Sequence, residues 1–519
     1  MRGRTRSTAP WRSTERSMNE IASPARTCEP IASFSNSYAR LPERFFARLE
    51  PTPVDNPHLI QFNAGLATEL GLHIAGLDAD TLAGIFAGNL IPQGAEPIAM
   101  AYAGHQFGGF VPALGDGRAI LLGEVIDRQG VRQDIQLKGS GPTPYSRLGD
   151  GRATLGPMLR EYLISEAMHA LGIATTRSLA VVTTGERVRR ERTLPGAVLT
   201  RVAASHVRVG TFEYFAARAD LDAIQRLADY VIDRLYPEAR EAPEPLWALL
   251  RGVVDRQAQL IARWMHVGFI HGVMNTDNMA ISGQTIDYGP CAFMDAYDPA
   301  TVFSSIDQFG RYAYANQPRI AQWDLACFAQ TLLPLLDTEP ARAVERANEL
   351  LGALPSLFAR YWLEGMRSKL GLLIAEEQDL ELAQSLLDAM YRNKADFTLT
   401  FRRLCDAADS AQADAGARAL FSNPANYDEW AARWRLRLSR EPRQPAERAQ
   451  AMRRVNPAFI PRNHRVEQAL DAAVAHAELA PFSELLQVLS RPYEEQSAYA
   501  AYAEPPPPEQ RVLQTFCGT

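Results

Sequence analysis

The chain has 519 residues, 46% of them hydrophobic and 22% charged, with a formal net charge of -6 at pH 7. Since one hydrophobic core rarely extends beyond about 250–300 residues, the length predicts two or three domains or lobes. The apolar content is ordinary for a soluble protein, there is no apolar run of about 18 residues to span a membrane, and the negative charge argues against non-specific binding to nucleic acid.

The cysteine and lysine content of the chain indicates its cellular compartment and its source. The cysteines lie far apart without a C-x-x-C pair, which excludes a zinc ribbon and argues against a secreted disulfide framework. Fifty-one arginines against three lysines are typical of a GC-rich bacterial genome. We therefore expect a bacterial, cytoplasmic protein. Its cysteines are Cys28, Cys291, Cys327, Cys405 and Cys517.

The first 17 residues are rich in arginine and serine and contain one acid, Glu15. This composition resembles a mitochondrial transit peptide. The alternative, which we favour, is that translation starts at Met18. We accordingly place residues 1–37 outside the folded protein, as a disordered or mis-started segment, and keep a mitochondrial location as the alternative.

The next region is predicted to be rich in strands. Residues 41–72 show two short amphipathic patterns interrupted by prolines, which predict two short helices. Ala119–Asp127 and Val131–Lys138 alternate in the manner of strands around a turn at residues 128–130, which predicts a β-hairpin.

Lys138 ends the second predicted strand and, with Gln136, faces away from the apolar residues of that strand. Burying an unpaired ammonium group is costly. We therefore expect Lys138 to have a specific anionic partner; the alternative is an ordinary surface lysine. A helix predicted for Pro157–Leu171 carries two carboxylates, Glu161 and Glu166.

The hexapeptide LGDGRA occurs twice, at Leu114–Ala119 and at Leu148–Ala153. Glycines around an aspartate, followed by arginine, can bring backbone N–H groups and a guanidinium to a phosphate. Either copy alone is equally compatible with a plain turn.

Helical patterns dominate after a predicted strand at residues 196–203. Residues 278–289, NMAISGQTIDYG, are predicted as a short hairpin. The proline run Pro505–Pro508 favours an extended segment that leaves the tail tethered and flexible. We divide the folded chain into a β-rich lobe at 38–205, a helical lobe at 206–420, and a helical extension with its tail at 421–519.

A glycine-rich loop, a hairpin ending in lysine and a helix bearing glutamate follow one another as in a protein-kinase small lobe. His271, Asn278 and Asp287 continue this order. Two residues after the histidine, where a kinase keeps its catalytic aspartate, stands Val273, which cannot accept a proton. Asp277 is the nearest carboxylate.

Asn278 and Asp287 offer the neutral and anionic oxygens that Mg²⁺ prefers, and Mn²⁺ is equally compatible. N-T-D-N alone is typical of a loop, but its place before Asp287 predicts a nucleotide–metal site. We interpret His271 as a structural histidine, because no third ligand follows to complete a metal site with His266.

Four stretches resemble the selenoprotein O family of pseudokinase-fold protein adenylyltransferases. They are AGHQFGGFVPALGDGRAILLGE, DIQLKGSGPTPYSRLGDGRA, HGVMNTDNMAISGQTIDYGP and NPAFIPRNHRVEQAL, within a similarity that covers Tyr38–Ala475. The resemblance implies an α+β, bilobed protein-kinase-like fold with a β-rich N-lobe, a helical C-lobe and a C-terminal helical extension. It also implies that ATP binds in reversed orientation, so that AMP passes to Ser, Thr or Tyr hydroxyls of proteins, the enzyme itself included.

The resemblance assigns roles to residues. Asp277 matches the proton acceptor, and Asn278 and Asp287 match the Mg²⁺ ligands. Lys138 matches the phosphate-contacting lysine and Glu161 the glutamate that pairs with it. Further nucleotide contacts match Gly115, Gly117 and Arg118 of the first LGDGRA copy, Asp150 and Gly151 of the second, Asp287, and the phosphate-holding Arg201 and Arg208.

The residues themselves leave two other functions open. The His271-Gly272 dipeptide is common in small-molecule phosphotransferases, although Val273 argues against one. Val273 also allows a non-catalytic nucleotide-binding scaffold. The resemblance further implies a cysteine-containing family form through Cys517, for which Cys291 is a candidate disulfide partner.

Overall fold

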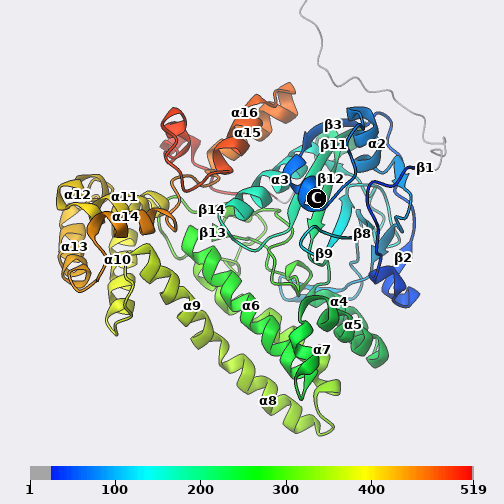
Figure 1. Cartoon of the computed structure of the whole chain (residues 1–519), viewed down its shortest axis with the longest axis horizontal. Coiled ribbons are helices and arrows are strands. Elements are labelled where there is room, and N and C mark those ends of the chain that lie inside the picture. Colours follow the sequence, from blue (N-terminus) through cyan, green and yellow to red (C-terminus); the bar gives the residue numbers. More distant parts are fainter. Residues whose placement is uncertain (1–24, 517–519) are drawn as a thin grey trace, which may run out of the picture.

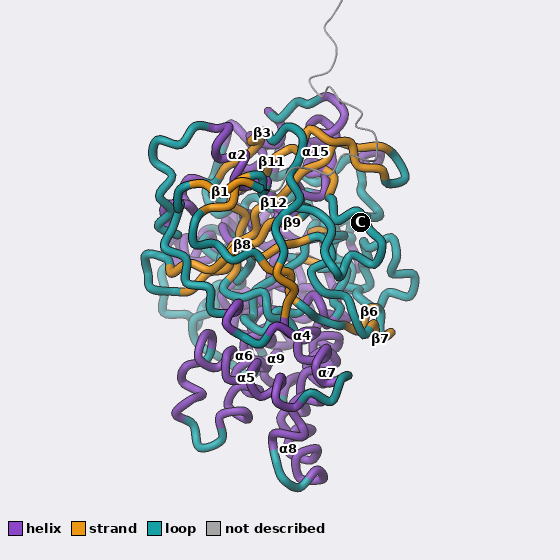
Figure 2. Tube along the Cα trace, turned by 90° about the vertical axis from the view of Figure 1, so that its right-hand side faces the viewer, coloured by secondary structure: helices purple, strands orange, loops and turns teal. Residues whose placement is uncertain are grey.

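The computed structural model describes residues 25–516, and it divides into a sheet-rich N-terminal region and a helical C-terminal region (Figure 1). Figure 2 shows the strands gathered in one half of the molecule and long helices in the other. The predicted mixture of a β-rich first part and a helical second part is therefore confirmed. The stretch that contains both candidate start sites lies outside the described residues. The placement of residues 1–37 outside the folded protein is wrong for residues 25–37, because β1 (Arg26–Cys28) pairs with β4 (Leu90–Pro92) and Ile31 is 2% exposed.

The N-terminal region is built on one antiparallel sheet with the strand order β2-β5-β8-β9-β12-β11-β3, and β10 pairs with β12 in addition. The hydrogen-bonded neighbours β8, β9 and β12 place residues from three segments of the chain at the same end of the sheet. The bounds are β2 Phe46–Arg48, β3 His58–Phe62, β5 Ile98–Met100, β8 Ala119–Ile126, β9 Arg132–Lys138, β10 Ala153–Thr154, β11 Arg177–Arg189 and β12 Thr193–Ala203.

The predicted hairpin is confirmed as β8 and β9, in which Ala119 pairs with Lys138. Its turn is fixed locally, because Oδ1 of Asp127 accepts hydrogen bonds from the N–H groups of Gln129 and Val131 at 2.9 Å each. Gly130 adopts a φ of 82°, which glycine tolerates best.

The sheet has an apolar core on each face. Alternate residues of a strand point to opposite faces, so Val181 of β11 packs in the core that contains α3 (Leu155–Ala170), and Val182 packs with α2 (Ala79–Ala87). The predicted alternation in β9 is confirmed as well, because Ile135 and Leu137 lie in the core with α2.

Residues 41–72 correct the prediction of two short helices. The structure has one α-helix there, α1 (Ala64–Glu69), one short 3-10 helix (Glu43–Phe45), and two strands, β2 and β3. Both strands are at the ends of the sheet, where β3 pairs with β11. A three- to five-residue pattern suits either element, and the neighbouring strand decides between them.

The helical region begins at α4 and continues through the extension. Figure 1 shows α6, α7, α8 and α9 forming its long arm, while α10 to α14 lie together at the opposite side from the sheet. The bounds are α4 Val209–Ala216, α5 Leu221–Leu235, α6 Pro245–Val267, α7 Gln317–Leu336, α8 Pro340–Gly352, α9 Leu354–Lys369, α10 Asp379–Asn393, α11 Phe397–Asp409, α12 Asp414–Arg418, α13 Pro424–Leu438, α14 Pro445–Arg453, α15 Asn463–His476 and α16 Ala480–Leu489. Among the described residues, no helix is both long and apolar enough to cross a membrane.

Residues 278–289 do not form the predicted hairpin. The expected turn is present, since the N–H of Gly283 donates to the carbonyl of Ala280 at 3.1 Å. The two arms nevertheless pair with other segments, Ala280 with Arg208 and Thr285 with Thr175. Tertiary partners thus replace the local pairing that the alternation predicted.

The tail, predicted to be tethered and flexible, is anchored at Thr515, while its neighbours Leu513 and Phe516 are exposed. Thr515 is 2% exposed, and its N–H donates to the carbonyl of Phe303 at 2.7 Å. In return, Ser305 donates its N–H to the carbonyl of Thr515 at 3.0 Å. This strand-like pairing anchors the tail beyond Pro505–Pro508, so the proline run is a spacer between two packed segments.

Arg462 ties the C-terminal helices to the rest of the helical region. Its guanidinium lies 2.7 Å from Asp396 and 2.8 Å from Asp295, and it is 1% exposed. We expect Arg462→Met to lower the free energy of unfolding by about 3–5 kcal/mol, because both carboxylates lose their counter-ion in a buried place. Urea unfolding followed by fluorescence measures this change.

The exposed pair of Arg418 and Asp428 supplies the control. Arg418→Met removes an ion pair of the same chemistry in solvent, where such pairs contribute little. Equal losses of stability in the two variants would contradict the structural role given to Arg462.

Candidate active site

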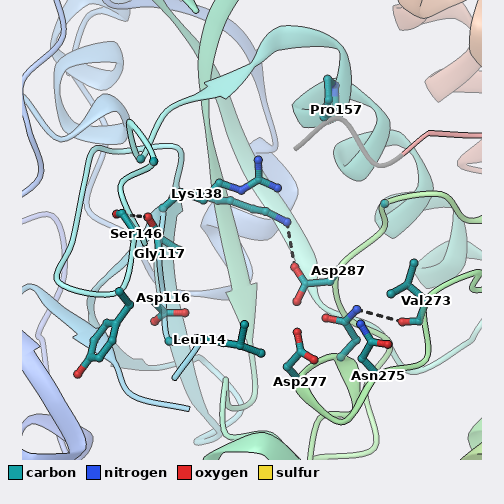
Figure 3. Close-up of a pocket in the computed structure, with 18 of the residues that line it drawn as sticks. Leu114, Asp116, Gly117, Lys138, Ser146, Pro157, Val273, Asn275, Asp277 and Asp287 are labelled. Atoms are coloured by element: carbon teal, nitrogen blue, oxygen red, sulfur yellow. Dashed lines mark hydrogen bonds and ion pairs between the residues drawn. The ribbon is translucent and has the colours of Figure 1, made fainter. Parts of the chain in front are cut away.

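A cleft of about 590 Å³ lies between the sheet and the helical region, and the predicted site residues line it (Figure 3). In Figure 3, Asp116 and Gly117 lie on one side and Val273, Asn275 and Asp277 on the other. The predicted residues that line the cleft are Gly115, Gly117, Arg118, Lys138, Asp150, Gly151, Glu161, Arg201, Arg208, Asp277, Asn278 and Asp287.

The first LGDGRA copy forms a tight loop against a second loop. A Cβ atom on Gly115, whose φ is 60°, would lie 2.3 Å from the Tyr145 ring, and one on Gly117 would lie 2.9 Å from the Tyr145 carbonyl oxygen. Only glycine fits at these positions without displacement. The guanidinium of Arg118 has no hydrogen-bond or ion-pair partner among residues 25–516, so it is free to bind an anion in the cleft.

The two copies are not equivalent in structure. Asp116 of the first is buried, which raises its pKa to about 6, and it accepts hydrogen bonds from the Met100 N–H at 3.0 Å and from Gln136 at 3.2 Å. Asp150 of the second is held by Arg190 at 2.7 Å, and this hydrogen bond lowers its pKa. The same hexapeptide therefore supplies a structural carboxylate in one copy and a surface ion pair in the other.

Three cations converge on the carboxylate of Asp287. Nζ of Lys138 and a guanidinium nitrogen of Arg201 lie 2.9 and 2.6 Å from Oδ1, and Arg208 lies 2.8 Å from Oδ2. Burial alone raises the pKa of Asp287, but the cations, Arg201 foremost, outweigh it and hold the pKa well below its usual value. The residue also has a φ of 63°, which is uncommon outside glycine.

Glu161 on α3 completes this group. It lies 2.7 Å from Nζ of Lys138 and accepts a hydrogen bond from Nε of Arg201 at 2.8 Å. The lysine on the predicted strand thus has two anionic partners. The whole lining of the cleft holds seven cationic side chains against five carboxylates, a surplus of positive charge that suits an anionic ligand.

Asp277 follows in a short 3-10 turn, Thr276–Asn278, at the edge of the cleft. Burial raises its pKa to about 6, against the opposing effect of Arg208. Its Oδ2 accepts a hydrogen bond from Gln106 at 3.3 Å, while its buried Oδ1 has no partner within the described part of the chain. The hydrogen-bonding capacity of this buried carboxylate oxygen is therefore unused within the described residues.

Asn278 and Asp287 line the same cleft, and their donor atoms fit a hard divalent cation. The amide nitrogen of Asn278 donates to the carbonyl of Val273 at 3.0 Å, while its amide oxygen accepts no hydrogen bond from any residue between 25 and 516. An amide oxygen and a carboxylate suit Mg²⁺ and Mn²⁺ alike.

His271 has the structural role expected of it. Its Nε2 lies 2.9 Å from the carbonyl of Ile286, and its ring stacks on Trp264. Burial lowers its pKa, which keeps the ring neutral. His266 is likewise bonded to the carbonyl of Trp362, at 2.9 Å.

A strand that sequence reasoning missed holds the loop that contains Asp277. It is β6 (Gly104–Gln106), which pairs with β7 (Gly109–Val111). The N–H of His105 donates to Oγ1 of Thr276 at 2.7 Å, and the next residue, Gln106, donates to Asp277.

Two further contacts extend this clamp. The N–H of Phe107 donates to Oδ1 of Asn275 at 3.0 Å. Glu213 on α4 accepts the hydroxyl hydrogen of Thr276 and lies 2.5 Å from Nδ1 of His105. The glycines of GHQFGGF were the only signal in the sequence, and for Glu213 there was none.

The cysteines are only partly described. Cys291 is fully buried, which raises the pKa of its thiol to about 12, and it is not in a disulfide. Cys517 lies outside the described residues. Thr515 donates its hydroxyl to the carbonyl of Pro290, next to Cys291, at 2.5 Å. A disulfide between Cys291 and Cys517 stays a prediction.

Comparison with known proteins gives a consistent picture. The model of the family described as "Protein adenylyltransferase SelO" matches residues 31–490. Proteins named "Protein nucleotidyltransferase YdiU" from Rhizobium meliloti and Bradyrhizobium diazoefficiens are 64% and 65% identical, each over 94% of this chain and 99% of the relative. The match extends over nearly the whole chain and includes every residue of the cleft. This chain therefore belongs to the SelO family of protein adenylyltransferases.

Proposed function

We propose that this enzyme transfers AMP from ATP to Ser, Thr or Tyr hydroxyls of proteins in the cleft between sheet and helices, and releases pyrophosphate. Family membership and the nucleotidyltransferase names of its relatives support the reaction class. The observation that carries the proposal is the convergence of Lys138, Arg201 and Arg208 on Asp287, beside the half-free carboxylate of Asp277.

The cationic groups bind the triphosphate in an orientation reversed relative to protein kinases. Arg201 and Arg208 are buried guanidinium groups that can bind phosphate oxygens in a forked geometry, and the unpaired Arg118 lies in the same cleft. The α-phosphorus then faces the acceptor hydroxyl, and the cations stabilise the charge that develops on the leaving pyrophosphate.

Asp277 orients the acceptor hydroxyl and takes its proton. Its free Oδ1 is available for that hydrogen bond, and a pKa raised to about 6 leaves it ionised at neutral pH yet basic enough to accept a proton. Gln106 fixes the other carboxylate oxygen. Val273, at the place where a kinase has its aspartate, is excluded from this role.

Asn278 and Asp287 hold the divalent cation, Mg²⁺ or Mn²⁺. A bound divalent cation supplies neutralisation of phosphate charge and fixes the orientation of the triphosphate. Asp287 is already ionised through its cationic neighbours, so no proton has to leave when the metal binds.

The relatives named above are bacterial, which supports action in a bacterial cytoplasm on protein substrates. Self-modification remains part of the proposal. The alternative of a mitochondrial location depends on residues 1–17, which lie outside the described part of the chain.

Labelled ATP separates adenylylation from the two alternatives. We expect label in protein from ATP labelled at the α-phosphate and none from ATP labelled at the γ-phosphate. Label from the γ position alone would indicate a phosphotransferase, and label from neither would indicate a scaffold. Gel autoradiography with candidate protein acceptors, and with the enzyme alone, reads out the result.

Asp277→Asn should lower the rate of AMP transfer by about 10²- to 10⁴-fold, because the amide cannot accept the hydroxyl proton. ATP affinity, measured by the nucleotide-dependent rise in melting temperature, should change little. The control is Asp229→Asn on the surface of α5. If the Asp277 variant turned over within threefold of the parent enzyme, Asp277 would not be the proton acceptor.

Removing divalent cations with EDTA should abolish AMP transfer, and adding Mg²⁺ or Mn²⁺ should restore it. Asn278→Ala should increase the metal concentration needed for half-maximal rate, because one oxygen ligand is lost. Initial rates across a metal titration measure this shift. An unchanged titration curve would remove Asn278 from the ligand set.

A further inference from the structure

A second cavity, of about 530 Å³, lies at the C-terminal end of α3 and between α6 and α9. Figure 1 shows α6 and α9 running side by side in the long helical arm. The cavity shares no lining residue with the nucleotide cleft. It is therefore a separate space, and nothing in the proposed AMP transfer makes use of it.

Lys369, the last residue of α9, lines this cavity and is 3% exposed. Its Nζ lies 4.1 Å from the centre of the Phe401 ring and 5.7 Å from that of Phe397. No carboxylate pairs with it among residues 25–516. The ammonium form therefore depends on aromatic rings alone, which attract a cation only weakly.

This environment favours the neutral amine. Burial lowers the pKa of Lys369 to about 7, and Cys405 opposes the shift slightly. Arginine, which the chain uses at nearly every other cationic position, cannot lose its proton in proteins. A lysine at this position thus supplies what arginine cannot, an uncharged nitrogen with a free lone pair near neutral pH.

The rest of the lining is positively charged. Arg263 on α6 and Arg454 after α14 are exposed and have no hydrogen-bond or ion-pair partner in the described part of the chain. The one carboxylate in the lining is the exposed Glu364. His266 adds no charge, because burial lowers its pKa to about 4. An anionic molecule is the ligand that such a lining favours.

We propose that Lys369 is a nucleophilic lysine that accepts an acyl group from an acyl phosphate bound in this cavity. The Nζ lone pair attacks the carbonyl carbon, a C–N bond forms, and the C–O bond to the phosphate breaks. Inorganic phosphate leaves with the bonding electrons, and the proton of the amine passes to solvent. The product is a neutral amide, which suits the apolar surroundings better than an unpaired ammonium group.

The wild-type chain is sufficient for the test, because it has only three lysines. Acetyl phosphate is the probe, and peptide mass mapping after Glu-specific proteolysis reports the modified site. At pH 7.5 we expect Lys369 to be acetylated at least tenfold faster than the exposed Lys394. Equal rates, or no modification of Lys369, would overturn the proposal.

The pH dependence adds a second readout. The rate at Lys369 should rise with pH and level off above pH 7, since only the neutral amine reacts. The charged and titratable groups around Lys369 are Arg263, His266, Tyr361, Glu364, Cys405, Arg454 and Tyr493. Burial raises the pKa of both tyrosines above 10.0, so neither titrates near pH 7. His266 is neutral above pH 5, and burial raises the pKa of Cys405 further above 9.0, so neither produces a midpoint near 7. A rate that kept rising up to pH 9 would contradict this assignment.

Binding of the anion is tested by competition and by matched variants. Inorganic phosphate should slow acetylation of Lys369 and leave Lys394 unaffected. Arg263→Gln and Arg454→Gln should slow it, while Arg251→Gln, on an exposed position of α6 outside the cavity, should not. If neither phosphate nor the two variants had an effect, the cavity would not bind the donor. No nucleotide is present, so the result is independent of the AMP-transfer proposal.

Discussion

The carboxylate of Asp287 joins the sheet to the helical region through ion pairs. Lys138 and Arg201 reach it from neighbouring strands, and Arg208 reaches it from the start of α4. Removing one partner from a buried ion pair costs about 3–5 kcal/mol, because the other charge stays buried and uncompensated. Each member of the group therefore fixes the others, within a cleft whose lining carries more cations than carboxylates.

The loop that contains Asp277 is held by a different kind of contact. Backbone N–H groups of His105 and Phe107 donate to the side chains of Thr276 and Asn275, the two residues before Asp277, and Gln106 donates to Asp277 itself. At Gly104 even a Cβ atom would lie 2.6 Å from the Asp277 carboxylate. A strand from the sheet-rich half thus packs so closely against the loop of the helical half that a methyl group at position 104 would collide with Asp277.

These two kinds of contact explain how far the sequence could predict the molecule. The hairpin of β8 and β9 was predictable because Asp127 and Gly130 determine its turn locally. The cost of burying a lone charge predicted an anionic partner for Lys138, and the family resemblance identified Glu161 as that partner. Residue types and their spacing thus pointed to Lys138, Asn278 and Asp287, whereas the roles of Arg201 and Arg208 came from the resemblance.

The remainder depends on contacts between distant segments. The hydrogen bond from Gln106 to Asp277 joins residues 171 positions apart, and no local pattern encodes it. The strand β3 exists because β11 offers it an edge, and Thr515 is buried because the loop containing Phe303 and Ser305 offers it hydrogen-bonding groups. In each case the deciding partner lies outside the window that a sequence pattern covers.

The two buried lysines show that the groups around a lysine determine the chemistry it can perform. Lys138 has two carboxylates within 2.9 Å, which pair with its ammonium group in the cleft. Lys369 has aromatic rings in place of carboxylates, and burial moves its pKa to about 7. Since an arginine would stay charged in either place, only a lysine can serve as a fixed cation in one cavity and as an uncharged nucleophile in the other.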